Sequence, residues 1–424
     1  MDHLGLTLLS LFVVLFALVS KRLETSPITA PMVFAGVGLV LGPLGFGLIE
    51  LDAESNVLHI LAEVTLGLVL FADASTIDIR ILRRNFSLPL RLLGVGLPLT
   101  IATGALAAQW LFPQLDVWQA ALIGAILAPT DAALGQAVVT SEKVPGRIRQ
   151  ALNVESGLND GICLPFVMMF LALASGGASH PGAYWAQYAA AQLILGPLVG
   201  VLVGWLGGKA LGRAAQAGWI NENFERLSSV ALALLAFCCA EMIGGNGFIA
   251  TFVGGLVFGN TAGNEVWQRA LTFAEAEGQL LGLLAFLAFG SASIAPALTT
   301  AGLAAVIYAV LSLTALRMIP VSLSLAGTGL GLRSHMFLGW FGPRGLASIL
   351  YVLLAVEETG LGAKEEIYAV VMCTVLLSVL LHGLTAAPAA AAYAAHSDAR
   401  IAAEPSWAGG HPVNEMPFRR PFRG

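Results

Sequence analysis

The stretch LAPTDAA, residues 127–133, carries a proline in the middle of an apolar segment, and FGPRGLA, residues 341–347, repeats that arrangement. A proline inside a helix has no N–H to donate, and its ring clashes with the preceding turn. Pro129 and Pro343 are therefore each predicted to break a helix. A broken turn frees backbone carbonyls, which hydrocarbon tolerates only where they are buried in protein or line a wet cavity.

A simple proline kink would account for either break taken alone. The first break, however, continues into Thr130 and Asp131, and the second continues into Arg344, so both carry polar groups at the depth of the break. Two matched breaks of this kind predict two broken helices that cross at mid-membrane. Their carbonyls and half-helix ends would then face an ion.

The composition places both breaks inside a membrane. Of the 424 residues, 57% are hydrophobic and only 11% are charged, whereas soluble domains carry about 25% charged residues. Long apolar runs recur along the whole chain and approach or exceed the ~20 residues needed to cross a hydrocarbon core. We therefore predict an all-α polytopic membrane protein in contact with lipid. Nothing in the sequence resembles a nucleic-acid-binding patch.

The apolar runs and their interruptions predict about thirteen membrane segments. They lie near residues 4–20, 28–49, 56–79, 88–112, 117–140, 150–175, 184–212, 226–243, 246–260, 267–291, 297–318, 334–356 and 365–394. The first segment lacks a basic start and a small-residue cleavage site, so we interpret it as a retained helix. Residues 395–424 are polar and rich in proline and glycine, which predicts a short flexible cytoplasmic tail after a transmembrane domain of residues 1–394.

The basic residues predict the orientation of these segments. With the N-terminus outside, every Lys and Arg falls on an inner loop or in the tail except two. Lys364 falls on an outer loop, and Arg344 falls within a segment. Cytoplasmic loops carry an excess of Lys and Arg. The pattern therefore predicts an odd number of segments with the C-terminus in the cytoplasm.

Three short stretches recur at nearly one spacing. GVGLVLG (36–42) resembles VGGLVFG (253–259), FADASTI (71–77) resembles FGSASIA (289–295), and the two proline stretches form the third pair. An odd number of predicted segments separates the copies of each pair, so the copies run in opposite directions. This pattern is typical of inverted-topology transporters, whose binding site lies at the midplane between the repeats.

The stretch VESGLNDG, residues 154–161, gathers polar side chains on an otherwise apolar helix. Ser156 and Asp160 are four residues apart and share one stripe of the helix, while Glu155 and Asn159 share the neighbouring stripe. Ionisable residues inside a membrane are rare, costly and functional by default. This helix is therefore predicted to carry the functional site.

Two further acids, Asp73 and Asp131, lie inside apolar runs, and each intramembrane acid could instead have a structural role. For Glu155 we favour a structural ion pair, because Arg344 is the one intramembrane cation in the predicted topology and an unpaired buried charge is very costly. With Glu155 assigned to Arg344, the predicted topology offers no second fixed cation to Asp160. Asp160 is therefore predicted to be functional.

A buried carboxylate such as that of Asp160 can avoid carrying a bare charge by binding either a proton or a cation. If only one fits at a time, proton and cation compete for one site, and alternating access converts that competition into antiport. Oxygen ligands from Asp160, Ser156 and Thr130 suit an alkali cation, and no imidazole or thiolate accompanies them in the sequence. The four cysteines lie in apolar runs without metal-ligand spacing. No cofactor is expected beyond the transported ions.

The motifs LFADAS, LAPTDAAL, VESGLNDG, GFIATFVGGLVFGN and WFGPRGLAS together resemble the monovalent cation:proton antiporters of the NhaP/NHE type, the Na⁺/H⁺ exchangers. They occur in the family's order between about residues 28 and 394. The resemblance implies a homodimer in which dimerisation helices hold a mobile core, with core helices around 88–175 and 297–394 that move as an elevator. It also implies that Asp160 is the shared proton and cation carboxylate, with Asn159 beside it as the family's Asn-Asp pair.

The same resemblance implies a Na⁺ site built from four oxygen-bearing side chains, those of Asp160, Ser156, Thr130 and Asp73. It gives Asp131 the role of capping a half-helix or tuning the site, and it pairs Glu155 with Arg344. Relatives with two aspartates at the Asn-Asp position are typically electrogenic. Asn159 therefore implies electroneutral exchange of one cation for one proton.

The sequence leaves other functions open. K⁺/H⁺ antiport on the same architecture needs the same ligand types, and the sequence does not resolve the size of the cavity. A passive cation channel would not need a titrating acid beside two broken helices. An intramembrane hydrolase would need a nucleophile–base pair or a metal motif, and neither occurs around Ser156, so no enzymatic activity is expected. The leading prediction is exchange of Na⁺ or Li⁺ for H⁺ across the inner membrane of a prokaryotic cell.

Overall fold

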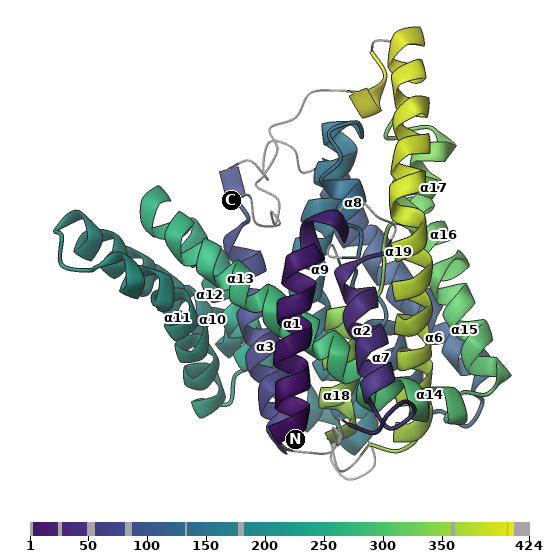
Figure 1. The fold of residues 1–424 in the computed structure, drawn as a ribbon, viewed down its shortest axis with the longest axis horizontal. Coiled ribbons are helices and arrows are strands. Elements are labelled where there is room, and N and C mark those ends of the chain that lie inside the picture. The colour runs from purple at the N-terminus through teal and green to yellow at the C-terminus, as the bar shows by residue number, and fades with distance from the viewer. Residues whose placement is uncertain are drawn as a thin grey trace.

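The structure is a computed structural model that describes residues 3–23, 28–48, 56–80, 87–131, 134–176, 182–357, 361–404 and 406–410. Every regular element in these ranges is a helix (Figure 1). The first half of the chain forms α1 (His3–Leu23), α2 (Ala30–Leu41), α3 (Asn56–Ser75), α5 (Ser87–Arg91), η1 (Leu92–Gly96), α6 (Leu97–Leu111), α7 (Val117–Ile126), α8 (Gln136–Val139), α9 (Gly146–Gly176) and α10 (Gly182–Gln216). The second half forms α11 (Glu222–Met242), α12 (Gly247–Gly259), α13 (Asn264–Ala288), η2 (Phe289–Ser293), α14 (Ile294–Thr300), α15 (Leu303–Leu313), α16 (Ala315–Ser324), α17 (Leu332–Trp340), α18 (Leu346–Glu357), α19 (Lys364–Ala403) and η3 (Ala408–Gly410).

The described helices account for the predicted membrane segments. Eight helical stretches are long and apolar enough to cross a membrane, and α2, α7, α12 and α18 are shorter apolar helices. Together with α3 they correspond one by one to the thirteen predicted segments. In the bundle, α10 and α11 lie at one side and α15 and α16 at the other, with α9 and α18 between them (Figure 1). The prediction of an all-helical polytopic membrane protein is therefore confirmed.

Both predicted helix breaks are present. α7 starts at a capping box in which Asp116 and Gln119 satisfy each other's backbone N–H groups, and it ends at Ile126, ahead of Pro129. α17 ends at Trp340, and helical structure resumes only at Leu346. The two non-helical stretches meet, because the backbone N–H of Asp131 donates to the carbonyl of Pro343 at 2.8 Å. The broken helices therefore cross at their breaks.

The glycines of the repeated stretches allow the two repeats to pack closely. A Cβ at Gly38 on α2 would collide with the carbonyl of Leu287 on α13. The matching glycine of the second repeat, Gly255 on α12, approaches the carbonyl of Phe71 on α3 in the same way. In each repeat, the helix that carries this glycine therefore packs against a helix of the other repeat, α2 on α13 and α12 on α3. This is the reciprocal packing expected of two inverted copies.

Two predicted boundaries differ from the structure around residue 300. The helix predicted for 267–291 continues through η2 and α14 to Thr300, because the wider turn of η2 bends the helix without ending it. The next segment, predicted for 297–318, is shifted to 303–324. Arg317, predicted on an inner loop, therefore lies within a membrane segment. Only 2% of its surface is exposed.

The predicted flexible tail also begins too early. α19 continues past residue 394 to Ala403, and η3 follows it. Trp407 is buried, and the guanidinium of Arg147, at the start of α9, donates to the carbonyl of Ala408. Residues 395–403 are therefore the end of a helix, and residues 406–410 pack against the start of α9, while the rest of the predicted tail, residues 411–424, lies outside the described residues.

Candidate ion-binding site

A cavity of about 40 Å³ lies beside the crossing of the two breaks. This volume is enough for about three water-sized spheres. The polar residues that line it are Asp73, Thr76, Thr130, Asp131, Asn153, Ser156 and Asp160. Six of these seven polar residues carry a carboxylate or a hydroxyl, so the cavity offers hard ligands of the kind that alkali cations prefer.

Thr130 joins the first break to α9. Its hydroxyl accepts a hydrogen bond from the amide nitrogen Nδ2 of Asn159 at 2.5 Å and lies 3.0 Å from the hydroxyl of Ser156. All three side chains are buried. Thr130 can turn toward α9 because it lies outside regular helix, and the structure thus brings together three of the residues predicted for the site.

Asp131 contributes to both breaks at once. Besides its backbone hydrogen bond to Pro343, its carboxylate oxygen Oδ2 accepts the N–H of Leu346 at 3.0 Å. Leu346 is the first residue of α18, where backbone N–H groups have no helical acceptor. Asp131 therefore caps a half-helix, but it is the half-helix of the opposite repeat.

Arg344 is fully buried at the second break and donates hydrogen bonds to backbone carbonyls of the first break. Its Nη1 donates to the carbonyl of Ala128 at 2.8 Å and to that of Pro129 at 3.2 Å. The hydroxyl of Ser348, one helical turn later, donates to the carbonyl of Ile126 at 2.8 Å. These backbone carbonyls, which the first break deprives of helical partners, thus accept hydrogen bonds from side chains of the second repeat. They are not left without hydrogen-bond partners in the membrane.

Glu155 has a different partner from the predicted one. Its Oε1 accepts a hydrogen bond from Nη2 of Arg317 at 2.9 Å, and only 2% of each side chain is exposed. The predicted pair of Glu155 with Arg344 is therefore corrected to Glu155 with Arg317. The sequence did contain a signal, because the apolar run that holds Arg317 continues to about residue 325 and thus places this arginine well inside it.

Asp73 and Asp160 reach the cavity from α3 and α9. Asp73 lies in the last turn of α3, where the hydroxyl of Thr76 donates to its backbone carbonyl at 2.7 Å. Thr76 and Asn153, which also line the cavity, were not predicted as site residues. Thr76 lies three positions after Asp73, and Asn153 lies seven positions before Asp160, which is the signal that the sequence offered.

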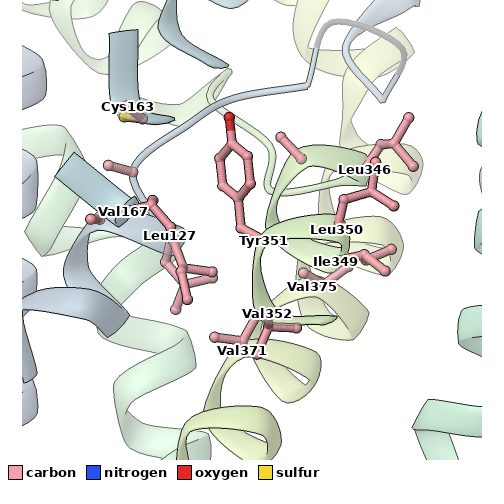
Figure 2. Close-up of a cluster of buried hydrophobic side chains, with 14 of the residues drawn as sticks. Leu127, Cys163, Val167, Leu346, Ile349, Leu350, Tyr351, Val352, Val371 and Val375 are labelled. Carbon is pink, nitrogen blue, oxygen red and sulfur yellow. The ribbon is translucent and has the colours of Figure 1, made fainter. Parts of the chain in front are cut away.

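Tyr351 fixes the backbone at Asp160. Its phenolic hydroxyl donates to the backbone carbonyl of Asp160 at 2.7 Å, and its ring is fully buried. Figure 2 shows the ring rising from α18, with Cys163, Val167 and Leu127 on one side, Leu346 and Leu350 on the other, and its oxygen at the far end. This hydrogen bond ties α18 to α9 next to the candidate carboxylate, a link that the sequence analysis did not identify.

The family model for the transmembrane sodium/hydrogen exchanger matches residues 8–392. This chain belongs to that family. Its similarity to solved structures supports the same fold: the sodium proton antiporter MjNhaP1 from Methanocaldococcus jannaschii superposes with a TM-score of 0.76 at 20% identity, covering 92% of this chain and 98% of that one. The family resemblance inferred from the five motifs is confirmed, and this member of the exchanger family is an integral membrane protein.

Relatives of this chain carry names with different cations. The chain is 25% identical over 394 residues to the K(+)/H(+) antiporter NhaP of Alkalimonas amylolytica, an alignment that covers 92% of this chain and 67% of the relative. It is 26% identical over 445 residues to the Na(+)/H(+) antiporter 2 of Zygosaccharomyces rouxii, covering 91% of this chain and 52% of that protein. This exchanger-family chain thus spans about two thirds of the first relative and about half of the second.

Proposed function

We propose that this protein exchanges Na⁺ or Li⁺ for H⁺ across a membrane, one cation for one proton, by competition for the carboxylate of Asp160. The observation that carries the proposal is the cavity at the crossing of the two helix breaks, where Asp160 shares the lining with the hydroxyls of Thr130 and Ser156. Membership in the sodium/hydrogen exchanger family supports it.

In this mechanism Asp160 is always neutralised, by a proton or by a cation. The cation would be held by the oxygens of Asp160, Asp73, Thr130 and Ser156, which replace part of its hydration shell. A proton on Asp160 removes the charge that attracts the cation, so the two ions exclude each other. Asn159 is uncharged, so the pair it forms with Asp160 carries one exchangeable charge, which favours electroneutral exchange.

The moving part of the proposed exchanger is a core formed by residues around 88–175 and 297–394. Buried hydrogen bonds connect these helices across the site: Glu155 on α9 with Arg317 on α16, and Arg344 before α18 with the first break. A unit held in this way would move as one body, as an elevator against dimerisation helices requires. The apolar face of α1, with Leu11 and Leu18 among its exposed residues, is available to lipid or to a second protomer in a homodimer.

The orientation of the proposed exchanger follows from the distribution of basic residues. An N-terminus outside and a C-terminus in the cytoplasm place nearly all Lys and Arg on the cytoplasmic side. The corrected position of Arg317 removes one residue from this side and leaves the pattern intact. We place the protein in the plasma membrane of a prokaryotic cell, and labelling of cysteines introduced at each terminus in intact cells tests the orientation.

Purified protein in liposomes tests the exchange directly. An outward gradient of Na⁺ or Li⁺ is expected to acidify the lumen when the cation leaves, because each departing cation is replaced by a proton. Clamping the membrane potential to zero with an ionophore is expected to leave the rate unchanged, since electroneutral exchange moves no net charge. Acidification that follows the membrane potential would contradict the one-for-one stoichiometry, and a cation gradient that moves no protons would contradict antiport.

Exchange of K⁺ for H⁺ is the second candidate. The observation in its favour is the relative named a K(+)/H(+) antiporter, whose alignment covers 92% of this chain. The same oxygen ligands serve Na⁺ and K⁺, so the proposed chemistry at Asp160 is unchanged. The liposome assay repeated with K⁺ distinguishes them, because the preferred cation gives the lower half-saturating concentration.

The exchange rate is expected to follow a bell-shaped curve with pH. At low pH protons occupy Asp160 and exclude the cation, and at high pH too few protons are bound to be carried back. Rates measured in liposomes at equal pH on both sides, from about pH 5 to about pH 9, test this expectation. A rate that stays constant over this range would contradict competition at one carboxylate.

A further inference from the structure

The second helix break frees backbone groups as the first one does, and α19 supplies the side chains that meet them. The backbone N–H of Arg344 donates to the hydroxyl of Ser378 at 2.6 Å. On the other side of the break, Nε2 of His382 lies 2.9 Å from the carbonyl of Trp340. Ser378 and His382 are four residues apart on α19 and therefore share one face of that helix.

The two side chains also contact each other. Nδ1 of His382 lies 3.2 Å from the hydroxyl of Ser378, and both side chains are fully buried. The indole of Trp340 packs against the imidazole at 4.9 Å between ring centroids. The same indole donates from Nε1 to the hydroxyl of Thr385 at 3.0 Å. The last residue of α17 is thus held to α19 by its carbonyl and by its ring.

The hydrogen bonds at the two ends of this chain have a fixed direction. The backbone N–H of Arg344 donates to the hydroxyl of Ser378, and a carbonyl only accepts, so Nε2 of His382 must carry the hydrogen that reaches Trp340. Between these ends, Nδ1 of His382 lies 3.2 Å from the hydroxyl of Ser378 and 3.1 Å from the backbone carbonyl of Ser378, so it contacts both oxygens of that residue. We call these two side chains, Ser378 and His382, the α19 relay.

We propose that the α19 relay fixes the second helix break and through it the first, so that Ser378 and His382 are positioning residues for the exchange. The relay holds Arg344 and Trp340, which lie on either side of Pro343. The carbonyl of Pro343 accepts the N–H of Asp131, and the Arg344 guanidinium holds the carbonyls of Ala128 and Pro129. The place of Thr130 in the cavity thus depends on groups that α19 holds. This inference rests on the proposed function only for its effect on transport.

Loss of either relay side chain is expected to weaken cation binding more than it slows turnover. In liposomes, Ser378→Ala and His382→Leu should each raise the half-saturating cation concentration about threefold to tenfold, the range expected for one lost hydrogen bond. The maximal rate should change by less than about twofold. The two substitutions combined should cost no more than the worse single one, because both cut the same chain.

Two variants control for packing. His382→Gln retains an N–H for the carbonyl of Trp340 and an acceptor for Ser378, so it is expected to restore most of the cation affinity. Thr374→Val alters a buried hydroxyl on α19 whose hydrogen bond, among the described residues, goes to its own helix at Val370, and it should leave the half-saturating concentration unchanged. If Ser378→Ala and His382→Leu behave like Thr374→Val, the relay does not position the site and the proposal fails.

A measurement on the unaltered protein tests the relay independently of transport. Nitrogen NMR of histidine-labelled protein in nanodiscs, with the His382 signal assigned by its loss in His382→Gln, reports which ring nitrogen carries the hydrogen. We expect a hydrogen on Nε2, where it reaches the carbonyl of Trp340. A neutral Nδ1–H form at pH 7, which leaves no hydrogen for that carbonyl, would overturn the relay even if exchange is observed. The expected form in a protein that exchanges no ions would instead count against the proposed function alone.

Discussion

Asp160→Asn is expected to abolish cation-driven proton movement in liposomes, down to the level of liposomes without protein. The substitution keeps the shape of the side chain and its place in the cavity, but an amide cannot bind a proton at neutral pH and carries no charge for a cation. The protein should fold normally. Its thermal unfolding midpoint should be equal to or above that of the unaltered protein, because a carboxylate in the membrane carries a desolvation cost that the amide avoids.

Two comparisons make the Asp160→Asn result specific. Asp398→Asn makes the same chemical change at an exposed position on α19, and it should leave exchange intact. Added Na⁺ or Li⁺ should raise the unfolding midpoint of the unaltered protein, since a ligand that binds only the folded state stabilises it, and this shift should vanish in Asp160→Asn. Coupled exchange that persists in Asp160→Asn would rule out Asp160 as the shared carboxylate.

Arg317→Ala is expected to lower the free energy of unfolding by about 3–5 kcal/mol, because it leaves the carboxylate of Glu155 buried without its partner. Glu155→Ala should have a similar effect for the converse reason. Replacing both together, with Glu155→Leu and Arg317→Met, should recover much of the loss, since an apolar pair needs no charge compensation. Thermal or denaturant unfolding of the purified protein in detergent measures these differences.

A double-mutant cycle distinguishes the observed pair from the one predicted by sequence. Glu155 and Arg317 should show a large coupling energy, and Glu155 with Arg344 a clearly smaller one, because Arg344 donates to the carbonyls of Ala128 and Pro129 instead. The exposed pair of Arg400 with Glu404 serves as a reference and should contribute about 0–1 kcal/mol. A coupling of Glu155 with Arg344 that exceeds its coupling with Arg317 would contradict the geometry of the site.

Much of the fold was predictable because it follows from local patterns in the sequence. The length of the apolar runs follows from the thickness of the bilayer, and the breaks at Pro129 and Pro343 follow from the missing proline N–H. The weak repeats predicted the crossing, since two inverted copies place their breaks at the same depth. Five of the seven polar residues that line the cavity, Thr130 and Asp160 among them, were predicted as site residues, because polar side chains inside an apolar segment are costly and usually functional.

The errors arose where a boundary or a partner depends on distant parts of the chain. The predicted tail is polar by composition, yet residues 395–403 continue α19, because Tyr393 stacks on Phe337 and Trp407 is buried. Arg317 was assigned to a loop because a segment was ended a few residues too early. The end of α19 is not visible in a local window, since the contacts that stabilise it come from helices far away in the sequence. The apolar run around Arg317, by contrast, does continue to about residue 325 in the sequence.

Local sequence patterns were enough to predict the class of protein, the order of its membrane segments, the two breaks and most of the polar side chains of the site. The pairing of the buried charges depends instead on how the helices pack. Glu155 and Arg317 are 162 positions apart, and their ion pair at 2.9 Å exists because α9 and α16 are packed so that these side chains meet. Composition fixes how many charges must be compensated, but electrostatic energy depends on distance, and distances between helices are set by packing.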